Sequence, residues 1–246
     1  MKNYKMVLQY EGTRYGGWQK QGNTDNTIQG RVEQVLGRMI GGPVTIHGSG
    51  RTDAGVHAEG QVANFIVDRS LKPEEITEYV NRYLPDDIRV LNTEEVPLQF
   101  HSRLNAKGKK YIYRIETGAK KDVFVRRLQY GLGRELDVEA MRQAAAFLCG
   151  THDFKSFCGN KKMKKSTVRT IERISIYQDK TLVVLNIAGD GFLQQMIRII
   201  AGTLIEVGLG TRSPDSLTDL LAVKDRQMAG YTAPAGGLCL AAVFYE

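Results

Sequence analysis

The spacing of apolar side chains changes within the first forty residues of the chain. Residues 4–10 place apolar or aromatic side chains at every second position, which predicts a β-strand. Residues 28–40 then place them along one face of a helix. Asn26 or Thr27 can cap the start of this helix, and Gly41 stands just past its end. The pattern therefore predicts a strand followed by an amphipathic helix.

The same two periodicities continue through the first half of the chain. Short strands are predicted at residues 44–47 and 61–67, and a closing strand at residues 88–91. Pro73 fits the first turn of a second helix, because its missing N–H would have no partner there anyway. The resulting order is β-α-β-β-α-β, the order of a ferredoxin-like unit.

The second half repeats this order without any repeat of individual residues. It shows a strand at 109–115, a helix at 137–148, strands at 168–177 and 182–187, a helix at 192–207 and a strand at 238–245. We therefore predict an α+β fold of two ferredoxin-like units with antiparallel sheets. Because the apolar periodicity lapses near residues 100–108, the predicted units are residues 1–104 and residues 105–246.

The composition of the chain indicates which kind of partner it binds and in which cellular compartment we expect it. Thirty-four Lys and Arg residues against 27 Asp and Glu give a net charge of +7, which favours a polyanionic partner. The three cysteines form no C-x-x-C pair, so they favour a reducing cytosol over a disulfide framework or a zinc ribbon. No signal-peptide pattern and no apolar run of about 18 residues is present. We expect a cytoplasmic protein that does not enter a membrane.

Residues 48–58, between the second and third predicted strands, carry the densest chemistry. This loop holds three glycines together with Arg51, Asp53 and His57. Glycines allow positive φ and close approach of a ligand, so the loop is suited to contact, although a turn capped by its aspartate has the same composition. A nucleophile elbow would need glycine at His47, and a dinucleotide fingerprint would need glycine or alanine at Asp53. The four histidines also lack metal-ligand spacing, so hydrolase, dehydrogenase and metal chemistry lose support.

Several motifs connect the chain to a known family. The run GSGRTDAGVHAEGQVANF at residues 48–65 resembles the signature loop of the tRNA pseudouridine synthase A family. Further family-like motifs follow the same order along the chain: YEGTRYGGWQ at 10–19, FHSRLNA at 100–106, KKYIYRI at 109–115, GTHDFKSF at 150–157 and GFLQQMIR at 191–198. The resemblance implies the pseudouridine synthase fold.

The resemblance also implies roles for individual residues. Asp53 matches the catalytic aspartate, and Arg51 matches the residue that helps hold the flipped nucleotide. We place His57, the imidazole of the same loop, with Arg51 among the substrate-binding candidates. Tyr111 matches the group that stacks on the base, and its hydroxyl is suited to move a proton. Arg198 matches the partner that keeps the aspartate ionised.

The family pattern is not matched everywhere. The family commonly has histidines where Gln194 and Gln195 stand, and an asparagine where Ile199 stands. These departures leave the assignment of Asp53 untouched. They bear on the substrate range and on the packing around Arg198.

The implied reaction turns uridine into pseudouridine at positions 38, 39 and 40 of the tRNA anticodon stem-loop. Because no net oxidation occurs, no redox cofactor is expected, and no metal is implied. The sequence leaves open whether the carboxylate attacks C1′, attacks C6 or follows a glycal route. The family works as a homodimer on tRNA, and we expect the same of this chain.

Basic residues supply the candidate phosphate contacts. Lys162 and Lys164, in the charge run from Lys161 to Lys165, are placed among the substrate-binding residues. The other candidates are Lys107, Lys109, Lys110, Arg126 and Arg127. The single tryptophan, Trp18, is expected to pack in the core although it can also stack on RNA.

Two other classes of protein share parts of this pattern. A non-catalytic RNA-binding protein fits the paired ferredoxin-like units and the positive charge. Lys109, Lys110 and Arg114, however, stand where an RNP1 motif needs aromatic or small residues. A small-molecule acid/base enzyme fits the Asp53 loop but gives the lysine clusters no role. Release of tritium from tRNA labelled at uracil C5 separates the three classes.

Overall fold

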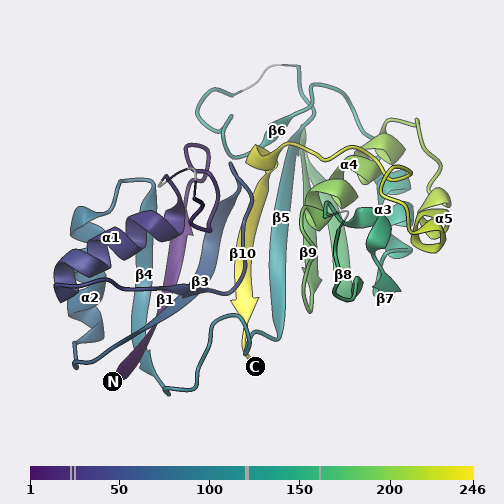
Figure 1. The fold of residues 1–246 in the computed structure, drawn as a ribbon. Helices are drawn as coiled ribbons and strands as arrows, with labels where there is room; N and C mark the ends of the chain where they lie inside the picture. The colour runs from purple at the N-terminus through teal and green to yellow at the C-terminus, as the bar shows by residue number, and fades with distance from the viewer. Residues whose placement is uncertain (23, 25, 120–121, 161) are drawn as a thin grey trace. The chain divides into compact units, whose positions relative to one another are not determined.

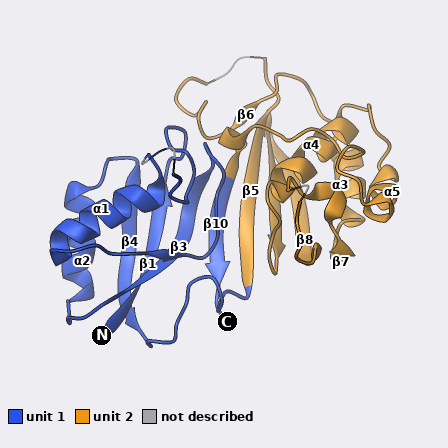
Figure 2. Ribbon diagram, in the orientation of Figure 1, with its two compact units in different colours: residues 1–107, 239–246 blue, residues 108–238 orange. Residues whose placement is uncertain are grey.

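A computed structural model of the chain describes every residue except 23, 25, 120, 121 and 161. The described residues form two compact units, which Figure 2 shows in blue and orange. Unit 1 comprises residues 1–107 and 239–246, and unit 2 comprises residues 108–238.

Unit 1 contains the predicted β-α-β-β-α-β order. Its elements are β1 (Lys2–Tyr10), α1 (Ile28–Ile40), β2 (His47–Gly48), β3 (His57–Val67), α2 (Pro73–Tyr83) and β4 (Ile88–Val96). Strand β1 lies antiparallel between β4 and β3, and β10 (Leu238–Phe244) pairs in parallel with the start of β3. Helices α1 and α2 lie side by side, with α2 against β4 (Figure 1). The fully buried Tyr4, Met6 and Leu8 of β1 belong to the core of this unit.

Helix α1 shows why its bounds were predictable. The side chain of Thr27 accepts a hydrogen bond from the Gly30 N–H at 3.2 Å, so Thr27 is the N-cap. Gly41 closes the helix with φ of +79°, a left-handed conformation that favours glycine. The predicted helix over residues 28–40 is confirmed in both bounds and caps.

The strand predicted at residues 44–47 is wrong for most of its length, because only His47 and Gly48 pair with β3. Side chains of α1 form hydrogen bonds with the backbone N–H and carbonyl groups that would pair with another strand. The Ile46 N–H donates to Glu33 Oε1 at 3.0 Å, and the Ile46 carbonyl accepts from Gln29 Nε2 at 3.3 Å. Val44 and Ile46 are still buried, so the apolar pattern was real while the hydrogen-bond partner was not a strand.

Unit 2 also places helices against antiparallel strands. Its elements are β5 (Gly108–Glu116), β6 (Tyr130–Gly131), α3 (Val138–Ala146), β7 (Gly150–Asp153), β8 (Val168–Asp179), β9 (Leu182–Gly189), α4 (Met196–Gly208) and α5 (Ser216–Val223). Strands β5, β9, β8 and β7 pair in this order and are antiparallel, and β6 adds a short parallel pairing to β5. Helix α3 packs on β8 and on α4 (Figure 1).

Several elements of unit 2 differ from the prediction. Strands β6 and β7 and helix α5 were not predicted. Helix α4 begins at Met196 and not at residue 192, because Gln195 has a φ of +60° and cannot continue a right-handed helix. Once begun, α4 is buried on nearly every side, as its apolar composition requires.

The division of the chain also differs from the expected one. The first break falls after Lys107, three residues beyond the predicted boundary, and residues 239–246 belong to unit 1. Cys239 and Leu240 of β10 pair with His57 and Ala58 of β3, which carries the end of the chain back to the first unit. The α+β class with mostly antiparallel strands is confirmed in both units. Within the described ranges, no helix has the length and apolar character to cross a membrane.

Candidate active site

Asp53 stands at the first position of a tight turn between β2 and β3 of unit 1. The Val56 N–H donates to the Asp53 carbonyl at 3.2 Å, and Gly55 has a φ of +78°. We call residues 53–56 the Asp53 turn. Asp53 is half-buried, while Ala54 beside it is exposed. The carboxylate therefore lies on a closed turn at the edge of the unit and not in its core.

The chain that follows β1 holds this turn from both sides. The Trp18 N–H donates to the Thr52 carbonyl at 3.1 Å, and the Gly55 N–H donates to the Tyr15 carbonyl at 3.3 Å. The Tyr10 and Thr52 hydroxyls are 2.8 Å apart and share a buried hydrogen bond. These contacts fix the backbone on each side of Asp53 before any substrate arrives, which is how a protein lowers the cost of orienting a reactive group.

Two glycines make this close approach possible. A Cβ atom on Gly12 would lie 1.9 Å from the Val56 carbonyl oxygen. A Cβ atom on Gly17, whose φ is +99°, would lie 2.6 Å from the Thr52 carbonyl oxygen. Only glycine fits either position, so both residues of the YEGTRYGGWQ motif serve the contact with the loop.

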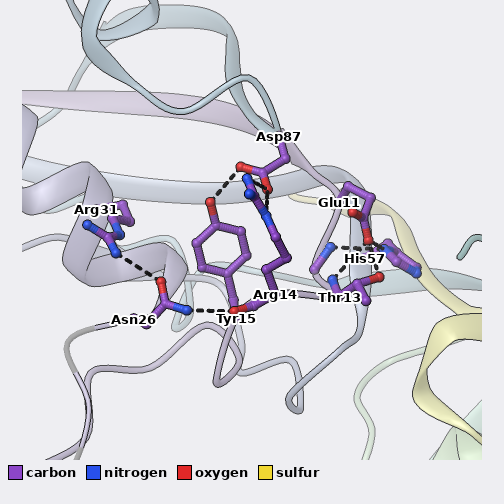
Figure 3. Close-up of polar contacts among 9 residues, drawn as sticks. Glu11, Thr13, Arg14, Tyr15, Asn26, Arg31, His57 and Asp87 are labelled. Atoms are coloured by element: carbon purple, nitrogen blue, oxygen red, sulfur yellow. Dashed lines mark hydrogen bonds and ion pairs between the residues drawn. The ribbon is translucent and has the colours of Figure 1, made fainter.

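His57 lies at the start of β3 and is 3% exposed. Its Nδ1 accepts a hydrogen bond from the Gly12 N–H at 2.9 Å and lies 3.5 Å from Glu11 Oε1 (Figure 3). The shorter contact requires Nδ1 to carry a lone pair, so His57 connects β3 to the segment that holds the Asp53 turn. Direct contact of His57 with substrate stays a prediction.

Arg51 is exposed two residues before Asp53. Its Nε donates to Gln19 Oε1 at 3.3 Å, and Gln19 Nε2 donates to Gln29 Oε1 of α1 at 2.7 Å. The guanidinium is thus oriented from the helix and reaches solvent. This position suits a group that contacts a nucleotide, and that role stays a prediction.

Trp18 packs in the core, as expected. Its side chain is 1% exposed, and a Cβ atom on Gly48 would lie 2.4 Å from the indole Nε1. The ring also packs against Tyr10 with 6.1 Å between ring centroids. Trp18 therefore packs in the core against Gly48, just before the residues that carry Asp53.

Tyr111 and Arg198 lie in unit 2. Tyr111 is 8% exposed on β5, and its ring makes a T-shaped contact with the Phe192 ring, with 5.3 Å between centroids and 89° between planes. Arg198 is half-buried on α4, where its Nε donates to the Ala233 carbonyl at 2.7 Å. Their meeting with Asp53 of unit 1 stays a prediction.

The predicted phosphate contacts are mostly exposed. Lys162 and Lys164 are exposed, as are Lys107, Arg126 and Arg127, whereas Lys109 and Lys110 are half-buried on β5. Lys161 lies outside the described residues. Their roles in binding RNA stay predictions.

Lys164 lines a cavity of about 600 Å³ in unit 2. Lys155, Lys165, Lys224 and Arg226 also line it, with Asp153 and Asp225 as the acidic members. The Thr167 hydroxyl donates to Asp153, and this bond, with Lys224 Nζ 3.0 Å from the carboxylate, lowers the Asp153 pKa. The cations outnumber the carboxylates here, so the cavity favours an anion.

No three His, Cys, Asp or Glu side chains gather into a possible metal site among the residues that the structure describes. The sequence analysis did not identify Glu11, Tyr15 and Asp87, which belong to or contact the segment that holds the Asp53 turn. The glycine-rich motif at residues 10–19 was the available signal, but no local pattern shows that it packs on residues 52–57.

Comparisons with known proteins agree with the motifs. A family model described as tRNA pseudouridine synthase matches residues 6–105 and 144–246. The tRNA pseudouridine synthase A of Bacillus sp. (strain KSM-64) is 45% identical over 245 residues, covering 100% of both chains. Proteins of the same name from Clostridium kluyveri and Acetivibrio thermocellus are 44% and 42% identical, again over 100% of both chains. The chain therefore belongs to the tRNA pseudouridine synthase family.

Proposed function

We propose that this protein isomerises uridine to pseudouridine in the anticodon stem-loop of tRNA and that Asp53 is its catalytic carboxylate. One observation carries the assignment of Asp53: within the family-matched chain, its turn is held by hydrogen bonds on both sides and lies beside the exposed Arg51. Such a turn holds the backbone of one carboxylate-bearing residue in place, which limits the directions that the carboxylate can take.

The reaction rearranges bonds without changing the oxidation state. The bond between C1′ of the ribose and N1 of uracil breaks, and a bond between C1′ and C5 forms. The proton on C5 is lost and N1 gains one, so the product is an isomer of the substrate. A carboxylate suits this chemistry because it is ionised near neutral pH and can act as a nucleophile or as a base.

The other site residues have complementary proposed roles. Arg198 stabilises the ionised form of Asp53, since a nearby cation favours a carboxylate. Arg51 holds the flipped nucleotide, and Tyr111 stacks on the uracil and moves the last proton. The buried contact of His57 with Gly12 supports a role in shaping the substrate-binding loop.

Basic residues bind the tRNA backbone in this proposal. The target base must leave its stack, which costs a few kcal/mol, and contacts with phosphates help to offset that cost. The exposed Lys162 and the cavity-lining Lys164 support such contacts in unit 2. Because tRNA is the substrate, the proposed location is the cytoplasm.

We also propose a homodimer. Val123, Phe124 and Leu128 of unit 2 are 59%, 91% and 41% exposed, and a second copy of the chain could remove this apolar surface from water. Sedimentation equilibrium should give twice the 27.5 kDa mass of one chain. A monomer mass at assay concentrations would contradict the proposal.

The role of Asp53 is tested by Asp53→Asn. The substitution keeps the size of the side chain and removes the charge, so we expect no tritium release from tRNA labelled at uracil C5. Affinity for tRNA should stay close to that of the wild type, because phosphate contacts supply most of it. Filter binding and a tritium-release assay measure the two effects.

Asp68→Asn serves as the matched control, because Asp68 is an exposed carboxylate just after β3 of the same unit. This variant should release tritium at the wild-type rate. Wild-type turnover by Asp53→Asn would refute the catalytic role.

A further inference from the structure

The segment from Tyr10 to Trp18, which we call the cradle segment, takes no chemical step in the proposed reaction. Its backbone nevertheless lies against the Asp53 turn, with one hydrogen bond to each side of Asp53. One of these bonds uses the Tyr15 carbonyl, which accepts from the Gly55 N–H at 3.3 Å. Whatever fixes Tyr15 therefore fixes one side of the turn that carries the carboxylate.

The side chain of Tyr15 is fastened to a part of the fold distant in sequence. Its ring is 5% exposed, and its hydroxyl donates to Asp87 Oδ1 at 2.5 Å (Figure 3). Burial and the Asp87 carboxylate both raise the pKa of this hydroxyl, so it remains a donor at neutral pH. Tyr15 thus contacts the Asp53 turn with its backbone and Asp87 with its side chain.

Asp87 is tied to the cradle segment by more than Tyr15. It stands between α2 and β4, and the Arg14 guanidinium donates to its Oδ2 from two nitrogens at 2.9 and 2.6 Å (Figure 3). Its carbonyl accepts from the Glu11 N–H at 2.9 Å. A carboxylate with this many donors is a fixed anchor and not a mobile surface charge.

We propose that Tyr15 is a positioning residue for the catalytic carboxylate: its hydrogen bond to Asp87 holds the carbonyl that orients the Asp53 turn. This inference rests on the proposed role of Asp53. The effect is on the rate and not on the affinity, because Tyr15 is buried and acts on the direction of one reacting group. A misplacement of about 1 Å can cost on the order of a hundredfold in rate.

Tyr15→Phe tests the proposal because it keeps the buried ring and removes only the donor. The single-turnover rate at saturating tRNA should fall about tenfold or more, while the tRNA dissociation constant should change by less than about twofold. Thermal unfolding of the same variant reports any loss of stability. A positioning role predicts a rate loss larger than that of a variant with an equal loss of stability.

Tyr4→Phe supplies that comparison. Tyr4 is a fully buried tyrosine toward the other end of β1 from the cradle segment, and its hydroxyl donates to the Leu71 carbonyl at 2.9 Å and accepts from the Leu71 N–H at 2.8 Å. Its loss should lower the unfolding temperature at least as much as Tyr15→Phe, without lowering the single-turnover rate.

A second variant tests the anchor. Asp87→Ala removes the acceptor from the other side, so it should lower the rate at least as much as Tyr15→Phe. Tyr15→Phe combined with Asp87→Ala should be no slower than Asp87→Ala alone, because both act through one contact. A double variant that is slower than Asp87→Ala alone, as two independent effects would make it, would overturn the proposal.

The outcomes also separate this inference from the function on which it rests. A Tyr15→Phe variant at the wild-type rate, beside an inactive Asp53→Asn variant, would refute the positioning role alone. A rate loss in Tyr4→Phe equal to that in Tyr15→Phe would reduce Tyr15 to a structural residue. An active Asp53→Asn variant would refute the proposed function itself.

Discussion

Tyr111 carries two groups that one substitution can separate. Its ring makes a T-shaped contact with Phe192 inside unit 2, and its hydroxyl is the group proposed to move the last proton. Tyr111→Phe keeps the ring contact and removes the hydroxyl. The single-turnover rate should fall by roughly 10²- to 10⁴-fold, the usual contribution of general acid–base catalysis, with tRNA affinity unchanged.

Tyr113→Phe is the matched control for this prediction. Tyr113 is fully buried two residues further along β5, and its hydroxyl donates to the Pro234 carbonyl at 2.8 Å. Losing this bond should cost about 1 kcal/mol of unfolding free energy without slowing the reaction. If Tyr111→Phe reacts as fast as the wild type, Tyr111 is a stacking surface only.

At the scale of single residues, the sequence identifies site residues that lie together in one motif and misses those that only the fold brings together. Asp53, Arg51 and His57 were found because they lie in one motif. Tyr15 and Asp87 were missed as partners because 72 positions separate them in sequence, and only the packing of β1 beside β4 brings them together. Trp18 was predicted correctly because a lone tryptophan usually packs in a core.

At the scale of elements, prediction succeeds where the determinants are local. Helix α1 has its apolar stripe, its Thr27 cap and its Gly41 stop within the segment itself, so its bounds follow from the sequence. The segment around Ile46 has an apolar pattern too, but its backbone partners are side chains of α1. Apolar periodicity reports burial, and it does not report which group completes the hydrogen bonds.

Helix α4 shows a second limit at this scale. Phe192 and Leu193 are apolar and stand just before the apolar residues of the helix, so the pattern predicts an earlier start. The left-handed conformation of Gln195 stops the helix there, and a Cβ on Gly159 would lie 2.4 Å from Gln195 Oε1. The start of α4 is therefore set by packing against a distant glycine as well as by its own sequence.

At the scale of the whole molecule, the order of elements predicted two α+β units but not the division of the chain. The last strand follows the elements of unit 2 in sequence, and its residues 239–246 belong to unit 1. Strand pairing in β10 depends on the register of Cys239 with His57, which no local pattern specifies. The net charge of +7, by contrast, is a sum over the whole sequence, so it is known without the structure.

The charge also allows the proposed tRNA contacts to be counted. Each phosphate contact releases counterions, so the slope of log K against log salt measures the number of contacts. Replacing both Lys162 and Lys164 by Ala should weaken binding and flatten this slope by about 1.4 to 1.8. Replacing both Lys72 and Arg82 by Ala removes the same charge from unit 1, where Lys72 caps the start of α2 and Arg82 lies in its last turn, both exposed, and should leave the slope nearly unchanged. Equal flattening in both double variants would mean that net charge alone governs the affinity, and an unchanged slope in the Lys162 and Lys164 variant would remove these lysines from the tRNA-binding surface.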